Sequence, residues 1–133
     1  MSRVHIVQVG SVLVATLGDE LDDESALGLQ TDIGERVVRS RGAGVLLDIS
    51  ALDIVDSFIC RVLGDTAKVV RVLGAEVAIV GMRPAVAITL VELGLPLDGV
   101  TTALTLDAGM AALTRIAAAR KRGDASPRTG TLR

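Results

Sequence analysis

Three carboxylates and one hydroxyl lie close together near the middle of the chain. Asp48 lies at the end of a predicted strand, next to its last residue, and Asp53 lies in the loop that follows. Asp56 and Ser57 stand at the start of a predicted helix. In an open α/β sheet, ligands and modifications are usually received at the carboxyl ends of strands. An ordinary loop, in which Asp56 or Ser57 caps the helix by accepting a bond from a backbone N–H, explains the same residues. Local chemistry alone leaves both interpretations open.

Ser57 is suited to carry a phosphate, because the first turn of a helix offers unpaired N–H groups and the positive end of the helix dipole. The dipole would stabilise a phosphate there by about 0.3 to 1 kcal/mol. Two unit charges roughly 6 Å apart repel by about 2 to 3 kcal/mol at an effective dielectric constant of about 20, so repulsion from Asp53 and Asp56 should exceed that gain. A phosphate of charge about -1.5 to -2 would therefore change the surface that a partner meets without unfolding the domain. Such behaviour is typical of a binding switch.

The sequence offers little for enzyme or metal chemistry. His5 is the single histidine and has no cysteine or carboxylate at metal-ligand spacing, and Cys60 is expected to be a small buried side chain. Neither GxGxxG nor GxxxxGK(S/T), the glycine-rich phosphate-binding patterns, occurs. A magnesium site would need carboxylates from a second strand end, where only Asp19 and Glu20 are available. We therefore expect no enzymatic activity, no metal and no cofactor.

Composition limits the remaining classes of protein. The chain has 133 residues, of which 50% are hydrophobic, 23% charged and 1% aromatic, and its formal charge is -2. This length supports one core, and neither the charge nor the lack of aromatic residues favours a nucleic-acid partner. The apolar stretch over residues 85–91, which includes Thr89, is far shorter than the roughly 18 residues of a membrane helix, and one cysteine excludes a disulfide framework. The N-terminus lacks the apolar centre of a signal peptide, so a cytoplasmic protein without a membrane partner is expected.

Changes in hydrophobic period predict an alternation of strands and helices. Residues 4–17 alternate around Gly10 and Ser11, which predicts a hairpin of two strands. Helices are predicted over residues 22–40, 57–73, 84–93 and 111–119, with Asp107 capping the last, and strands over residues 45–49, 76–80 and 100–105. This order predicts an α/β domain with a mixed β-sheet, in which the N-terminal hairpin is followed by parallel strands and about four helices pack on the sheet.

Spacing and charge also predict how the helices are oriented. Acidic residues lead the first helix and arginines close it, as the helix dipole favours. The side chains predicted to be buried are Leu27, Ile33, Val37 and Val38 in the first helix, and Phe58, Val62, Ala67, Val69, Val70 and Leu73 in the second.

The chain is expected to form one domain over residues 1–119, followed by a tail over residues 120–133. The tail is rich in small and polar residues and has a single acidic residue, Asp124. Its basic residues are Arg120, Lys121, Arg122, Arg128 and Arg133. This composition predicts a disordered segment, either a solvated terminus or a basic arm for an acidic partner.

The segment from Asp48 to Phe58, DISALDIVDSF, resembles the STAS domain of anti-sigma factor antagonists, and most closely the RsbS proteins of the bacterial stressosome. The resemblance lies in an aspartate that ends a strand, a short loop, and an Asp-Ser pair at the start of a helix. It extends over residues 4–119 and implies a single STAS domain, whose mixed sheet is flanked by helices.

The resemblance also implies a role for the site. Ser57 would be phosphorylated by an RsbT-type serine kinase, while Asp48, Asp53 and Asp56 would belong to the surface that the kinase binds. The unmodified protein would hold the kinase and co-assemble with RsbR-like paralogues into a large cytoplasmic scaffold. Phosphorylation would release the kinase, and a serine phosphatase would reset Ser57.

One departure from the family pattern bears on the subtype. Simple antagonists of the SpoIIAA type usually continue Asp-Ser-Ser-Gly, whereas this chain has Asp56-Ser57-Phe58-Ile59. The difference favours the stressosome subtype. Two alternatives stay open: an antagonist that acts on an anti-sigma factor by partner switching, and a STAS module that binds a small ligand.

Phe58 and Arg83 complete the expected partner-binding surface. Phe58, the single aromatic residue, is either a core side chain in helical phase with Val62 or an exposed contact for the kinase. Arg83 precedes the helix that Pro84 opens, so it should lie at the same edge of the sheet as the aspartates. There it would pair with the acidic side chains of the loop or face a partner.

Overall fold

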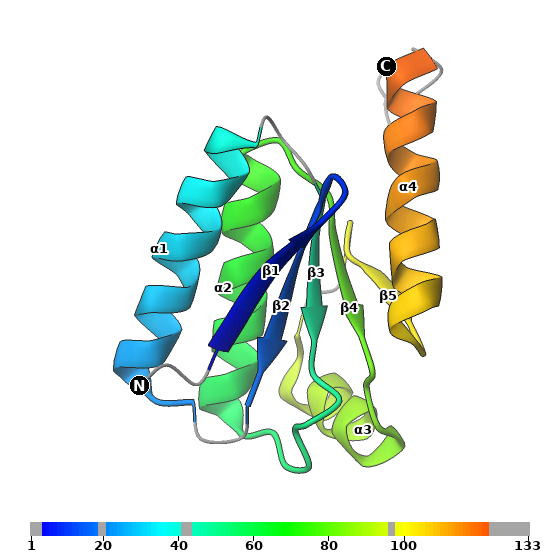
Figure 1. The fold of residues 1–133 in the computed structure, drawn as a ribbon. Helices are drawn as coiled ribbons and strands as arrows, with labels where there is room; N and C mark the ends of the chain where they lie inside the picture. Colours follow the sequence, from blue (N-terminus) through cyan, green and yellow to red (C-terminus); the bar gives the residue numbers. More distant parts are fainter. Residues whose placement is uncertain (1–3, 19–20, 41–43, 96–97, 123–133) are drawn as a thin grey trace, which may run out of the picture.

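The computed structural model describes residues 4–18, 21–40, 44–95 and 98–122 (Figure 1). The elements are β1 (Val4–Val9), β2 (Val12–Leu17), α1 (Asp23–Arg39), β3 (Gly44–Asp48), α2 (Ser57–Val72), β4 (Val77–Val80), α3 (Pro84–Leu93), β5 (Thr101–Ala103) and α4 (Leu106–Arg122). The order of elements predicted from the sequence is confirmed.

The strands form one five-stranded sheet in the order β1-β2-β3-β4-β5. β1 and β2 are antiparallel, whereas each later strand is parallel to the strand before it. α1 and α2 cover one face of the sheet, and α4 covers β3, β4 and β5 on the other (Figure 1). α3 lies at the end of the sheet where β3 and β4 finish. The predicted mixed sheet, a hairpin followed by parallel strands, is confirmed.

β3 and β4 are buried on both faces, which explains why their sequences are continuous apolar runs. On β3, Val45 and Leu47 pack with α1 and α2 in the larger core cluster. Leu46 points to the opposite face, where it packs with Leu113 of α4 in a smaller cluster. β4 alternates in the same way, so the two central strands join both layers of helices to one sheet.

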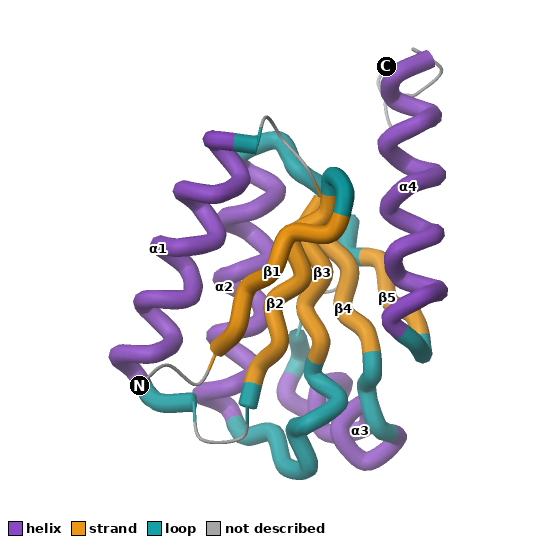
Figure 2. The backbone as a smooth tube through the Cα atoms, in the orientation of Figure 1, coloured by secondary structure: helices purple, strands orange, loops and turns teal. Residues whose placement is uncertain are grey.

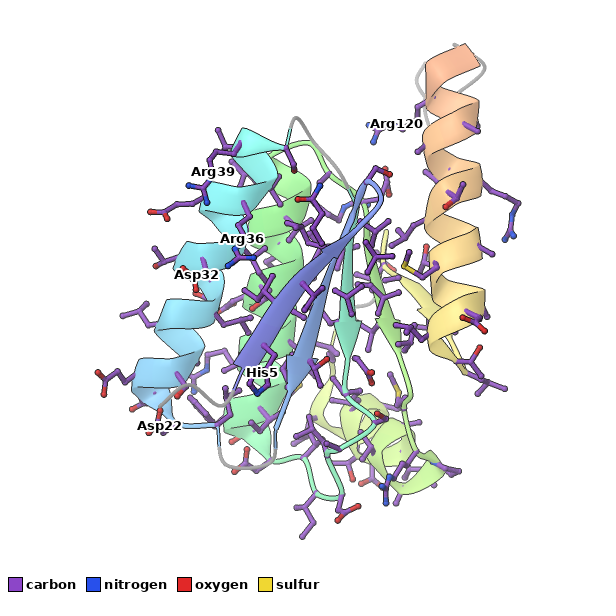
Figure 3. All side chains as sticks on the ribbon, viewed as in Figure 1. His5, Asp22, Asp32, Arg36, Arg39 and Arg120 are labelled. Atoms are coloured by element: carbon purple, nitrogen blue, oxygen red, sulfur yellow. The ribbon has the colours of Figure 1, made fainter. Side chains whose placement is uncertain are left out.

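α1 carries the charge pattern predicted for it. The side chain of Asp22 caps its start by accepting a hydrogen bond from Ser25 N at 2.8 Å. Arg36 and Arg39 lie in its last turn (Figure 3). Opposite charges at the two ends match the helix dipole and support a helix at this position.

The predicted buried faces of the first two helices are partly wrong. Leu27 and Val38 are 66% and 65% exposed, because the core-facing stripe of α1 lies on an adjoining side of the helix. That stripe is formed by Ala26, Leu29, Ile33 and Val37. In α2, Val69 is only half-buried, and Leu73 is 41% exposed because it is the C-cap residue at the end of the helix.

α4 is longer than the helix predicted over residues 111–119, since it runs over Leu106–Arg122. Its start was misassigned because Thr105, predicted to end a strand, caps the helix by accepting a hydrogen bond from Ala108 N at 3.1 Å. Asp107 therefore lies in the first turn of α4 rather than at the cap.

α4 also continues into the segment predicted to be a tail. Arg120 belongs to the helix and reaches towards the sheet (Figure 3), where its Nη1 donates to Glu76 Oε2 at 2.9 Å. The rest of the predicted tail, residues 123–133, lies outside the described residues. Within the described ranges, none of the helices combines the length and the apolar composition needed to cross a membrane.

Candidate functional site

The predicted site residues gather at the carboxyl ends of β3 and β4. Because these strands are parallel neighbours, the segments that follow them emerge at the same edge of the sheet. We call residues 49–56 the β3–α2 loop and residues 81–83 the β4–α3 loop. Figure 2 shows both at this edge, beside α3. The topology thus brings Arg83 to the loop that carries the aspartates, as the sequence predicted.

The β3–α2 loop is held by buried side chains and by its own hydrogen bonds. Leu52 and Val55 are buried and anchor the loop in the core. Asp48 Oδ1 accepts a hydrogen bond from Ser50 N at 3.0 Å, and Leu52 N donates to Ile49 O at 3.0 Å. The half-buried Asp48 thus stabilises the turn out of β3, and a partner-binding role for it stays a prediction.

Asp56 is the cap of α2, one of the two capping residues that the sequence allowed. Its Oδ1 accepts a hydrogen bond from Ile59 N at 2.9 Å. Ser57 is therefore the first residue of the helix, and its side chain is exposed. Ser57 therefore lies in the first turn, whose N–H groups the helix itself leaves unpaired, and phosphorylation of its hydroxyl stays a prediction.

Arg83 joins the two loops. Its guanidinium forms an ion pair with Asp53, and its Nη2 donates a hydrogen bond to Ser50 O at 3.1 Å. Of the two roles expected of Arg83, pairing with an acidic side chain of the loop is present, with Asp53, and a partner-binding role stays a prediction. The Arg83 and Asp53 side chains are 55% and 65% exposed, so solvent screening keeps the ion pair below about 1 kcal/mol.

Phe58 and Cys60 both follow Ser57 into the helix and face the protein interior. Phe58 is partly buried and packs against the larger core cluster, in agreement with the core alternative. Contact between Phe58 and a kinase stays a prediction. Cys60 is buried at 8% exposure, and this burial raises the pKa of its thiol. The thiol is therefore kept protonated, as expected of a small apolar side chain.

His5 lies two strands from Asp48, because it pairs with Thr16 of β2, which pairs with Asp48 of β3. It lies on β1, the edge strand of the sheet, with its side chain exposed (Figure 3). Among the described residues, no three His, Cys, Asp or Glu side chains are arranged to hold a metal ion.

Two residues of the site were not predicted from the sequence. Gly81 passes so close to Ser50 that a Cβ atom on Gly81 would lie 2.8 Å from Ser50 Cβ. A glycine directly after a buried strand is a weak signal in a chain that contains 14 glycines. Ile54 is 82% exposed between Asp53 and Asp56, and its place at the surface depends on the path of the loop rather than on residue type.

Two solved structures of stressosome proteins are similar to this chain over most of its length. The RsbS of Moorella thermoacetica, in a variant with one serine replaced by glutamate, is 38% identical, with a TM-score of 0.78; the match covers 88% of this chain and 99% of that chain. A chain from a structure described as the molecular architecture of the stressosome is 37% identical, with a TM-score of 0.77, and the match covers 85% and 98%. The anti-sigma factor antagonist SpoIIAA is similar in fold alone, at 12% identity and a TM-score of 0.63 over 84% of this chain and 97% of that chain.

The RsbT co-antagonist protein RsbRA of Bacillus subtilis is 32% identical to this chain over 100 residues. That match covers 75% of this chain and 36% of RsbRA, so the chain spans little more than a third of the length of this relative. The family model of the STAS domain matches residues 3–109, which include the whole sheet, both loops of the site and the start of α2. The chain therefore belongs to the STAS domain family.

Proposed function

We propose that this protein is a non-catalytic stressosome scaffold that holds an RsbT-type serine kinase and releases it when Ser57 is phosphorylated. One observation carries the proposal: Ser57 is exposed as the first residue of α2, behind the capping carboxylate of Asp56. Similarity to RsbS at 38% identity over most of the chain supports the same role.

The geometry explains how a phosphate would act at this position. The α2 dipole and unpaired N–H groups favour a phosphate on Ser57, so the helix would tolerate the modification. The carboxylates of Asp53 and Asp56 lie on the same exposed loop and repel added negative charge. A kinase surface that complements the unmodified loop would therefore lose affinity once the phosphate is added.

Assembly with related STAS proteins forms the second half of the proposal. Similarity to RsbRA, whose name describes it as an RsbT co-antagonist, supports RsbR-like paralogues as the partners. Similarity to a chain of the stressosome structure supports a large homo- or hetero-oligomer. A serine phosphatase that removes the phosphate from Ser57 would complete the cycle.

Binding of an RsbT-type kinase to Ser57 variants tests the proposal. Ser57→Ala should fold and bind the kinase as the unmodified protein does, because it cannot be phosphorylated. Ser57→Asp should weaken binding about tenfold or more, which corresponds to about 1.4 kcal/mol. Ser11→Asp adds the same charge in the exposed hairpin turn at the opposite end of the sheet and should leave binding unchanged. Equal affinity for Ser57→Asp and Ser11→Asp would contradict the proposal.

A further inference from the structure

The two loops of the site fit together with no room for a side chain at position 81. The Gly81 backbone has φ +78°, a conformation that favours glycine. A Cβ atom at this position would lie 2.8 Å from Ser50 Cβ and 3.1 Å from Asp48 Oδ1. Carbon atoms in good contact are about 3.5 to 4.0 Å apart, so the β4–α3 loop passes Ser50 at a distance that only glycine allows.

Arg83 ties the same loops at a second place. One nitrogen of its guanidinium pairs with Asp53, and another donates to Ser50 O at 3.1 Å. The guanidinium therefore holds the β3–α2 loop at two residues on either side of Leu52. Its planar set of donors suits this bridging position, whereas the single ammonium of a lysine would not reach both acceptors equally well.

The strands below the loops are joined as well, because Ile49 N donates to Val80 O at 3.0 Å. Val80, Gly81 and Arg83 therefore contact successive parts of the β3–α2 loop, from Ile49 to Asp53. The loop then continues to Asp56, whose side chain caps α2 beside Ser57. The position of the phosphoacceptor is therefore connected, through a short stretch of backbone, to the β4–α3 loop.

We infer that Gly81 and Arg83 are positioning residues that hold the β3–α2 loop in one conformation and thereby fix the surface around Ser57. Arg83 acts inside the molecule, because its guanidinium is already engaged with Ser50 and Asp53. The effect on a kinase rests on the function proposed above, but the contact between the loops does not. If the loop adopts the binding-competent conformation only part of the time, the apparent Kd rises in inverse proportion to the fraction of molecules in that conformation.

Amide hydrogen exchange, measured by NMR on the isolated protein, tests the role of Arg83. Arg83→Ala should accelerate exchange at Ser50 and Leu52 about tenfold, since it removes a charge-assisted hydrogen bond and an ion pair. Arg115→Ala removes an exposed arginine from α4, on the other face of the sheet, and should leave these rates unchanged. Equal rates in Arg83→Ala and the wild type would overturn the inference.

Two glycine substitutions test the close approach of the loops. Gly81 and Gly94 share a φ of +78°, but only a Cβ at Gly81 meets other atoms within 4 Å. Both changes to alanine carry the same backbone strain, so their difference reports the contact with Ser50. Gly81→Ala should shift the NMR resonances of residues 48–56, and Gly94→Ala should not. If neither variant, or both equally, shifted these resonances, the inference would be wrong.

Exchange of the two charges separates positioning from direct contact with the kinase. With an RsbT-type kinase, Arg83→Asp should raise the KM for this protein about tenfold at unchanged kcat, and adding Asp53→Arg should recover most of the loss. Failure of the exchanged pair to recover the KM, despite wild-type exchange rates at Ser50 and Leu52, would mean that direct charge contacts rather than the loop conformation set kinase binding, contrary to the inference. If the wild type is not phosphorylated on Ser57, the proposed function fails, while the exchange rates and resonance shifts still decide the positioning role.

Discussion

Thr66 is a buried polar residue whose hydroxyl affects the stability of the core. Its side chain is fully buried in α2, and its hydroxyl oxygen has no hydrogen-bond partner among the described residues. A buried hydroxyl without a partner costs about 1 to 3 kcal/mol, whereas a methyl group in the same place costs nothing in lost hydrogen bonds. The core thus contains a polar atom that opposes its stability.

We predict that Thr66→Val stabilises the protein by about 1 kcal/mol, measured by chemical denaturation. Thr89 is the matched control, because its Oγ1 donates to Ala85 O at 3.0 Å. Thr89→Val should therefore lower the free energy of unfolding by about 0.5 to 1 kcal/mol. A loss of stability in Thr66→Val would show that its hydroxyl is paired in solution.

Because of Cys60, the free energy of unfolding should depend on pH in the alkaline range. Burial raises the pKa of its thiol in the folded state above the usual 9.0. The neutral thiol is the form that the fold prefers, so this contribution to stability is complete below pH 9.0 and is lost as the pH rises through the folded-state pKa. The free energy of unfolding should fall more steeply above pH 9.0 in the wild type than in Cys60→Ala. Identical slopes in the two proteins would contradict this.

At the scale of elements, α4 packs closely on the sheet at Gly109. This residue is buried, and a Cβ atom on it would meet Val80 Cγ1 and lie 3.0 Å from Leu46 Cδ1. The glycine therefore lets the helix approach β3 and β4 closely. The same residue makes the start of α4 hard to recognise, because glycine lowers the helix propensity of the sequence.

Gly109→Ala should destabilise the protein by about 1 to 3 kcal/mol, since the added methyl group overpacks the interface between α4 and the sheet. Gly28 in α1 offers the opposite case, because it is exposed and a Cβ atom there would meet nothing within 4 Å. Gly28→Ala should stabilise by about 0.5 to 1 kcal/mol through helix propensity alone. Thermal unfolding of both variants checks the pair, and equal effects would refute the close packing at Gly109.

The elements that depend on short-range sequence signals were predicted well. The hairpin around Gly10 and the helix opened by Pro84 follow from turn and helix-start preferences, and the structure contains both. Asp56 was one of two predicted caps, and the place of Arg83 beside the loop followed from parallel strands ending at one edge. The approach of Gly81 to the neighbouring loop depends on tertiary contacts, which no local pattern encodes.

At the scale of the whole molecule, the two layers of helices leave the carboxyl edge of the sheet to α3 and the two loops of the site (Figure 1). Large apolar side chains are strongly exposed in the elements of this edge: Ile54 in the β3–α2 loop, Val91 in α3 and Leu104 directly after β5 are 82%, 75% and 83% exposed. Val91 and Leu104 line the same surface hollow, and a contiguous exposed apolar patch favours contacts with other proteins. This surface agrees with a protein that works in an assembly, as proposed above.

Phosphate mapping tests the central proposal most directly. The protein is incubated with an RsbT-type kinase and ATP, the phosphate is located by mass spectrometry, and the size of the complex is measured before and after the reaction. We predict phosphate on Ser57 together with loss of the kinase from the complex. An active kinase that leaves Ser57 unmodified, or that stays bound after Ser57 is phosphorylated, would contradict the proposal.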